Sequence, residues 1–420
     1  SNYKHNMVTK YDLFEYMYKK GTVLKPLELV SEFKKSDVEY HNVYKMLQEL
    51  EKSRFVVKNE KGFQVVRSTR NDLLFNLIKF CIANKINYNE ILDANIADFI
   101  CKAVAKQKFS AKNFNLNPRT FTKYVEILSK YGFLIFLSKK PLEATIPYNS
   151  FLKDLAGFFG CTLILPKYEN DSFVEEIKSE LSKFLKLKKK NNQRYMEIIN
   201  EYELKFIQHS LNLEGNPITL PETIKLLKDH IIPRELSVET VQEVQNYQKA
   251  MQIMIKDSEE KKPLTKESIL NYHYLAMQHR PEIAGKLRTV PVYIKGNPNF
   301  KVASVDKIEF ELNSLLQEYN SFIAKKKKSV KEILNFASYF HNAFQHIHPF
   351  VDGNSRTTRL ITFYLLRIEK FPMLDIPLGL LEEYLYSTKG SKERNDKKLS
   401  LVFQRIILYN LKSINEKMQY

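Results

Sequence analysis

The chain has 420 residues, of which 44% are hydrophobic and 27% charged, so it is long enough for two or three domains that each bury a core. This composition excludes a disordered protein, and no apolar run approaches the length of a membrane span, so we expect a soluble globular protein. The net charge of +18 indicates an anionic partner such as nucleic acid, a nucleotide or an acidic protein, but a general lysine bias would produce the same excess.

The three cysteines, Cys81, Cys101 and Cys161, are widely spaced and form no CxxC pair. We therefore expect neither a disulfide framework nor a thiolate metal site, and we expect a reducing compartment. No N-terminal run has the basic start, apolar centre and small-residue cleavage site of a secretory signal. The resulting expectation is a cytoplasmic protein with no membrane contact.

Residues 1–68 have the pattern of a winged helix. Helical periodicity over residues 9–20, 27–33 and 36–53 is followed by alternating apolar positions around a Lys-Gly turn. Ser36 is the expected N-cap of the third helix, the one that would enter a DNA groove. Its first turn would carry Asp37 and Glu39, whose charges repel phosphate, which argues against DNA binding by this copy.

Residues 69–165 are expected to form a second unit of the same kind, because residues 115–148 repeat the helix-then-hairpin order. Asn117 can cap the helix, and Pro118 suits its first position. Side chains in the first turn and in the hairpin turn could contact bases and phosphates; they are Arg119, Thr120, Lys123, Lys139 and Lys140. The alternative is a pair of units that serves protein contacts or dimerisation.

Residues 166–172, PKYENDS, have the composition of a linker, and a predominantly helical region follows them. Within that region, residues 346–359 read HIHPFVDGNSRTTR and place a short loop between two helical patterns. Gly353 permits a tight turn that directs backbone N–H groups at an anion at the helix N-terminus. Arg356 and Arg359 are one helical turn apart, so both can reach the same polyphosphate.

The same stretch contains a proton acceptor and a metal-binding carboxylate. His348 can take a proton near neutral pH, and Asp352 suits Mg²⁺, which prefers carboxylate and phosphate oxygens. Together with the arginines they indicate transfer from a nucleotide to a hydroxyl group. As an alternative, His346 and His348 could be two metal ligands, although no cysteine and no HExxH spacing supports zinc.

The stretch HPFVDGNSRTTR resembles the Fic-domain signature, and flanking similarity extends over about residues 175–420. The resemblance implies a mainly α protein, in which two winged-helix-like units precede a helical Fic core with a small β-hairpin flap. It further implies that His348 deprotonates a target hydroxyl, Asp352 holds Mg²⁺, and the nucleotide contacts Gly353, Asn354, Ser355, Arg356 and Arg359. Ser355 stands where the family usually has glycine, which crowds the anion site slightly if its φ stays helical.

Upstream, residues 284–294, AGKLRTVPVYI, alternate β-branched residues after Gly285 and predict a hairpin strand with an unpaired edge. The resemblance implies that this flap holds the target chain by backbone pairing. The residues assigned to it are Leu287, Arg288, Thr289 and Val290.

Residues 209–216, HSLNLEGN, end a helix expected over about residues 194–215, with Gly215 as its stop. Ser210 and Glu214 are four residues apart and share a face. The segment resembles the inhibitory helix of Fic proteins. We therefore expect Glu214 to pair with Arg359.

The leading hypothesis for function is a protein adenylyltransferase that transfers AMP from ATP, with Mg²⁺, to a Ser, Thr or Tyr hydroxyl of a protein target or of the chain itself. One alternative is transfer of another phosphate-containing group, or removal of AMP. Another is a DNA-bound regulator that senses a nucleotide without useful catalysis.

Overall fold

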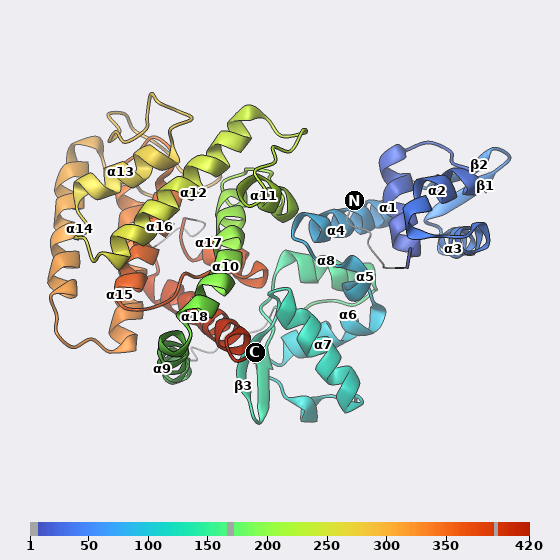
Figure 1. Cartoon of the computed structure of the whole chain (residues 1–420), viewed down its shortest axis with the longest axis horizontal. Helices are drawn as coiled ribbons and strands as arrows, with labels where there is room; N and C mark the ends of the chain where they lie inside the picture. The colour runs from blue at the N-terminus through green and yellow to red at the C-terminus, as the bar shows by residue number, and fades with distance from the viewer. Residues whose placement is uncertain (1–6, 166–171, 390–393) are drawn as a thin grey trace. The chain divides into compact units, whose positions relative to one another are not determined.

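The computed structural model describes residues 7–165, 172–389 and 394–420. The chain divides into an N-terminal unit, residues 1–102 with 150–164, and a C-terminal unit, residues 103–149 with 165–420. The described residues are mainly helical, and their strands form two antiparallel hairpins (Figure 1). The prediction of a mainly α fold is confirmed.

The N-terminal unit contains the three helices and the hairpin that the sequence predicts for residues 1–68. Its elements are α1 (Lys10–Lys20), α2 (Pro26–Glu32), η1 (Lys34–Ser36), α3 (Tyr40–Lys52), β1 (Val56–Asn59), β2 (Gly62–Val65), α4 (Thr69–Ala83), α5 (Tyr88–Ile91), α6 (Ala94–Ala105, whose last turn enters the other unit) and α8 (Ser150–Phe158). A capping box between Thr9 and Asp12 begins α1, and Gly21, with φ of 65°, ends it.

The predicted N-cap of the third helix is wrong. Ser36 lies in the short η1 helix, and Asp37, with φ of 51°, turns the chain before α3 begins at Tyr40 with Glu39 as its N-cap. A short aspartate tolerates this left-handed conformation, which interrupts the helical periodicity. Asp37 and Glu39 therefore precede the first turn of α3.

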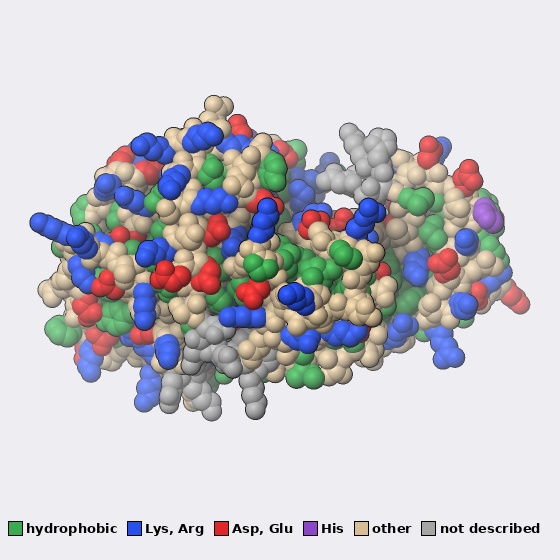
Figure 2. All heavy atoms as spheres, turned by 90° about the horizontal axis from the view of Figure 1, so that it is seen from below, with side chains coloured by type: hydrophobic (Ala, Val, Ile, Leu, Met, Phe, Trp, Pro, Cys, Tyr) green, Lys and Arg blue, Asp and Glu red, His purple; other side chains and the backbone are tan. Residues whose placement is uncertain are grey.

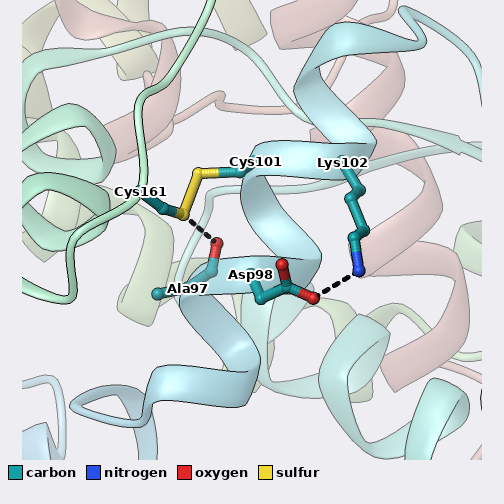
Figure 3. Close-up of a disulfide and its surroundings, with 5 residues drawn as sticks. All are labelled: Ala97, Asp98, Cys101, Lys102 and Cys161. Carbon is teal, nitrogen blue, oxygen red and sulfur yellow. Dashed lines mark hydrogen bonds and ion pairs between the residues drawn. A yellow bond between two sulfur atoms is a disulfide. The ribbon is translucent and has the colours of Figure 1, made fainter.

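The expectation of unpaired cysteines is also wrong for two of the three. A disulfide joins Cys101 in α6 to Cys161 after α8, with their Cα atoms 6.8 Å apart (Figure 3). The two residues are 60 positions apart, so their spacing carried no sign of the pairing. Cys81 is free and buried.

The C-terminal unit is a helical bundle with one hairpin. Its elements are η2 (Ala111–Asn113), α7 (Pro118–Lys130), β3 (Ile135–Lys139), β4 (Leu142–Thr145), α9 (Val174–Lys190), α10 (Asn192–Asn212), α11 (Leu220–Leu227), α12 (Val238–Glu259), α13 (Lys266–Ala276), η3 (Val305–Lys307), α14 (Ile308–Ile323), α15 (Val330–Ile347), α16 (Asn354–Ile368), η4 (Leu378–Leu380), α17 (Leu381–Tyr386) and α18 (Asp396–Lys417). No described helix is long and apolar enough to cross a bilayer.

The predicted helix and hairpin within residues 115–148 are confirmed, with Asn117 capping α7 and Pro118 in its first turn. They belong to the C-terminal unit, where Tyr409 of α18 donates a hydrogen bond to the Ser129 carbonyl at 3.0 Å. The domain boundaries at residues 68 and 165 stay a prediction. The linker at 166–172 lies, except for its last residue, outside the described residues.

The centre of the C-terminal unit is α16, whose residues 354–366 are all buried. Helices α12, α13 and α15 pack against it (Figure 1). Because α16 is enclosed on all sides, the polar side chains of its first turns must find partners inside the protein. These polar side chains and their partners form the candidate site.

Candidate active site

The site begins at the loop of residues 348–353 between α15 and α16, here called the signature loop. His348 ends α15 with φ of 49°, and Gly353 precedes α16 with φ of 79°. The Asn354 side chain accepts from the Phe350 N–H at 2.9 Å and donates to the Phe350 carbonyl at 2.8 Å. Asn354 therefore closes the loop, and its side chain is committed to the backbone.

Gly353 is required for two reasons. Its φ lies in the left-handed region, which a Cβ disfavours. An added Cβ would also lie 2.8 Å from Met277 Sδ and 3.1 Å from His273 Nε2. Any side chain at this position would require the Met277 and His273 side chains to shift.

The signature loop presents His348 as a neutral base. Its Nδ1 lies 3.0 Å from the Gln345 carbonyl, which can only accept, so Nδ1 carries the hydrogen and Nε2 keeps its lone pair. Burial lowers the pKa of His348 to about 4, and the charges of Lys389 and Arg288 act in the same direction. At neutral pH the imidazole is therefore unprotonated.

Because of this low pKa, the rate of any transfer reaction that uses His348 as its base should not fall as the pH is lowered from 8 to 5. A folded-state pKa of about 4, lowered from 6.5, keeps the base neutral throughout the range from pH 5 to 8. We expect kcat/KM to change by less than about twofold across that range, where a solvent-exposed histidine would titrate. A fall in rate centred near the ordinary histidine pKa would contradict the buried environment.

The strand predicted for residues 284–294 is not formed, and that segment is irregular. Arg288 is 3% exposed. Its Nε donates to the His348 carbonyl at 2.6 Å, its Nη2 contacts the Ala303 carbonyl, and its backbone N–H donates to the Pro349 carbonyl at 2.9 Å. Arg288 was assigned to target docking, but these bonds make it a support for the signature loop.

Of the other three residues assigned to the flap, Thr289 and Val290 are exposed and Leu287 is half-buried. Alternation alone predicted a strand here, but none of the described segments pairs with these residues as a ladder. The Arg288 guanidinium instead donates to the His348 carbonyl and to the Val290 carbonyl of its own segment. Thr289 and Val290 therefore remain the exposed part of the predicted docking segment.

His273 of α13 supports the loop from the other side. Its ring stacks on Phe350 with centroids 3.7 Å apart. The Gly285 N–H donates to Nδ1 at 2.9 Å, so Nε2 carries the hydrogen and donates to the Asp352 carbonyl at 2.8 Å. Burial lowers the pKa of His273 to about 4, which keeps this neutral tautomer.

Asp352 has a partly exposed carboxylate at the mouth of the loop. It accepts from Arg280 at 3.0 Å, from Arg356 at 3.3 Å and from the Gly353 N–H at 2.7 Å. Burial opposes its ionisation, but the charges of Arg356 and Arg280 and the Gly353 N–H together outweigh burial and hold the pKa below the usual range. With 45% of its side chain exposed, Asp352 fits the mode in which Mg²⁺ takes one protein carboxylate and completes its shell with phosphate and water oxygens.

The two signature arginines face different carboxylates. Arg356 forms an ion pair with Glu243 of α12, and Glu243 also accepts from Asn216 at 2.8 Å. Arg359, whose side chain is 2% exposed, donates from Nη2 to Glu214 at 2.9 Å. The pairing of Glu214 with Arg359 that we expected from the sequence is confirmed.

Ser210 extends the Arg359 pair into a network. Arg359 Nε donates to Ser210 Oγ at 2.7 Å, and that hydroxyl also bonds Tyr247 at 2.8 Å. Glu214 lies two residues beyond the end of α10, in the turn before Gly215. Burial opposes its ionisation, but the charges of Arg359 and Lys389 hold its pKa at about 2. The pair is therefore ionised at every pH at which the protein would be assayed.

Sequence reasoning missed four residues that complete the site: Glu243, His273, Arg280 and Lys389. Each contacts the signature loop or the first turn of α16 from at least 34 positions away in the chain. Their local sequences are ordinary helix or turn patterns, and no motif marks them. Only burial of a polar residue in an amphipathic helix could have singled out His273.

Residues 263–366 match the family model described as the Fic/DOC family. These residues form a Fic domain. Over 188 residues the chain is 29% identical to the protein adenylyltransferase Fic of Drosophila persimilis, and equally so to that of Drosophila melanogaster. The matches cover 44% of this chain but only 36% and 37% of those relatives, so the chain spans about a third of their length.

A solved structure shares the fold. It is a Fic-domain-containing signaling protein from Bacteroides thetaiotaomicron, with a TM-score of 0.51 and 21% identity. The match covers 58% of this chain and 98% of that one. The likeness shows a shared fold over the matched part of this chain.

Proposed function

We propose that the Fic domain transfers AMP from ATP to a Ser, Thr or Tyr hydroxyl of a protein. One observation carries the proposal: the lone pair of a neutral, buried His348 stands beside a helix N-terminus flanked by two arginines. Such a helix end binds phosphate, and the histidine can accept the hydroxyl proton. The names of the Drosophila relatives agree with this activity.

In the proposed reaction the target hydroxyl oxygen attacks the α-phosphorus of ATP. His348 Nε2 takes the hydroxyl proton, a new P–O bond forms, and the bond from the α-phosphorus to the pyrophosphate oxygen breaks. Arg356, Arg359 and the N–H groups that open α16 would stabilise the phosphates. Asp352 would hold Mg²⁺, which when bound neutralises phosphate charge.

We propose that Glu214 keeps the free protein mostly inactive. Arg359 is held by this carboxylate and by Ser210, so it is not available to the terminal phosphate of ATP. ATP could bind beside this pair but with its α-phosphorus misaligned for attack. Transfer then requires that Glu214 withdraw from Arg359.

For target docking we propose the segment that contains Thr289 and Val290, which is exposed close to the signature loop. A target chain, or a mobile part of the chain itself, would pair with its backbone. Self-modification is therefore included in the proposal.

Labelled ATP separates the proposed activity from its alternatives. The Glu214→Gly variant should incorporate label from the α position into protein and none from the γ position. Label from γ would indicate phosphorylation, and release of AMP from a modified protein without incorporation would indicate the reverse reaction. Binding of ATP with no transfer of label would indicate that the protein senses a nucleotide without catalysis. Intact-protein mass spectrometry would show the added mass and any self-modification.

DNA binding is a second candidate function, favoured by the exposed first turn of α7. Arg119 and Lys123 are exposed there, directly after the Asn117 cap. Against it, Lys139 at the end of β3 is paired with Glu416 at 2.9 Å. On the face drawn in Figure 2, Lys and Arg side chains lie among Asp and Glu and form no single basic patch.

If α7 does bind DNA, replacing both Arg119 and Lys123 with alanine should weaken binding to a duplex about tenfold at low salt. The slope of log K against log salt should fall by about one per lost phosphate contact. Lys45→Ala, on the exposed face of α3, is the matched control and should have no effect. Absence of duplex binding at low salt, or binding insensitive to salt, would assign these units to protein contacts.

We also propose a cytoplasmic location, which the sequence suggested. The Cys101–Cys161 disulfide is more typical of an oxidising compartment and weighs against it. Localisation of the tagged protein, together with the redox state of this pair in cells, would decide.

A further inference from the structure

Lys389 contacts two residues of the site and belongs to no recognised motif. It lies in the turn after α17, where Asn297 Nδ2 donates to its carbonyl at 2.9 Å. Its Nζ donates to Glu214 Oε2 at 3.1 Å and to Ser355 Oγ at 3.0 Å. The Lys389 side chain is 20% exposed, so it is not fully buried.

Ser355 is the residue that departs from the usual Fic signature, and it is the link between Lys389 and the anion site. It is the second residue of α16, one of the positions whose N–H has no partner within the helix. Its hydroxyl accepts from Lys389 and, at 3.2 Å, from Gln345 Nε2. No described residue accepts the hydrogen of this hydroxyl, so the O–H can be donated to a ligand.

The charges around Glu214 are unequal. One carboxylate, with 14% of its side chain exposed, pairs with two cations, Arg359 and Lys389. When Glu214 withdraws, both cations stay beside the N-terminus of α16 without their shared counter-charge. A buried cation that loses its partner is costly unless another anion replaces it. A polyphosphate carries enough charge to replace one carboxylate that served two cations.

We propose that Lys389 is a phosphate-binding residue that exchanges Glu214 for the terminal phosphates of ATP. Ser355 holds the ammonium group at the N-terminus of α16 and donates its own O–H to the same phosphate. Ser355 takes up space that the usual glycine would leave open to the ligand. Its hydrogen bond to the phosphate makes up for that lost space. This inference rests on the proposed function of the site in binding ATP.

A different role for Lys389 predicts different measurements. If Lys389 only reinforces Glu214 in the inactive state, it has no task once Glu214 is removed. Lys389→Ala would then raise the activity of the parent protein and leave the Glu214→Gly variant unchanged. If Lys389 binds phosphate, its removal weakens ATP binding in the Glu214→Gly variant.

The test is calorimetric titration of the Glu214→Gly protein with ATP, ADP and AMP. Adding Lys389→Ala should weaken ATP binding about tenfold, the effect of one charge-assisted hydrogen bond, and should leave AMP binding within about twofold. Lys389→Arg keeps the charge and should stay within about threefold of the Glu214→Gly protein. Lys326→Ala, an exposed lysine in the loop between α14 and α15, is the matched control. Unchanged ATP affinity, or equal losses for ATP and AMP, would overturn the proposal.

The role of Ser355 is tested by a double-mutant cycle in the same background. Ser355→Gly should weaken ATP binding about threefold, and adding it to Lys389→Ala should cause a smaller further loss, because only its own O–H bond to the phosphate remains to be lost. Additive losses would show that the two residues act separately. If Lys389→Ala lowers the melting temperature, Lys389→Gln gives a polar, uncharged side chain only one atom shorter than lysine and should still lose ATP affinity selectively. A Gln variant with full ATP affinity would overturn the proposal.

Binding and transfer can fail independently in this design. Loss of ATP affinity on Lys389→Ala without any AMP transfer by the Glu214→Gly protein would support the phosphate role and contradict the proposed activity. AMP transfer together with an ATP affinity that Lys389→Ala does not change would support the activity and reject the phosphate role.

Discussion

Replacing Glu214 with glycine should raise the rate of AMP transfer by about tenfold or more at saturating ATP. The substitution frees the buried Arg359 guanidinium, which Glu214 holds at 2.9 Å, so that it can bind the terminal phosphate and align the α-phosphorus. ATP affinity should rise by a smaller factor, because the other phosphate contacts exist in both states. The measurement is initial rate against ATP concentration for parent and variant.

Two further variants make this result specific. Glu214→Gln keeps the shape of the side chain and removes its charge, so it should activate partially. Arg359→Ala should be inactive with or without Glu214→Gly, because the group that the mutation frees is absent. If Glu214→Gly is no faster than the parent, the Glu214–Arg359 pair is structural and does not regulate the site.

Replacing His348 with alanine should abolish transfer, with a loss of about 10² to 10⁴-fold in kcat, the usual contribution of a general base. The measurement should be made in the Glu214→Gly protein, because its expected transfer rate is high enough for a large loss to be measured. ATP affinity should stay within about threefold, since the arginines and the N-terminus of α16 remain. Comparable rates with and without His348 would reject its assignment as the base.

The control for this experiment must separate chemistry from backbone strain. His348 has φ of 49°, which alanine disfavours and asparagine tolerates, so His348→Asn should be folded and equally inactive. His346→Ala changes a nearby histidine whose ring bonds the Lys301 carbonyl and contacts Phe300, and it should keep most of the activity. Equal losses at both histidines would instead support a shared metal site.

Much of the fold and part of the site followed from local sequence. Helical periodicity located α1, α2 and α7, and alternating residues around short turns located both hairpins, because burial of one face imposes these periods wherever the chain folds. The signature loop was predicted between two helices for the same reason. The Glu214–Arg359 pair could be expected because both residues lie in recognisable motifs.

Other features depend on contacts between distant parts of the chain. Periodicity after Gly285 indicated a strand, but Arg288 is 60 positions from the His348 carbonyl that it bonds, and that bond holds the segment in an irregular course. Lys389 is 175 positions from Glu214, and Cys101 is 60 from Cys161. A side chain's period along the chain reports whether it is buried, not which partner it meets. The partners are set by how helices pack around α16, where each buried polar group must be satisfied by whatever segment arrives beside it.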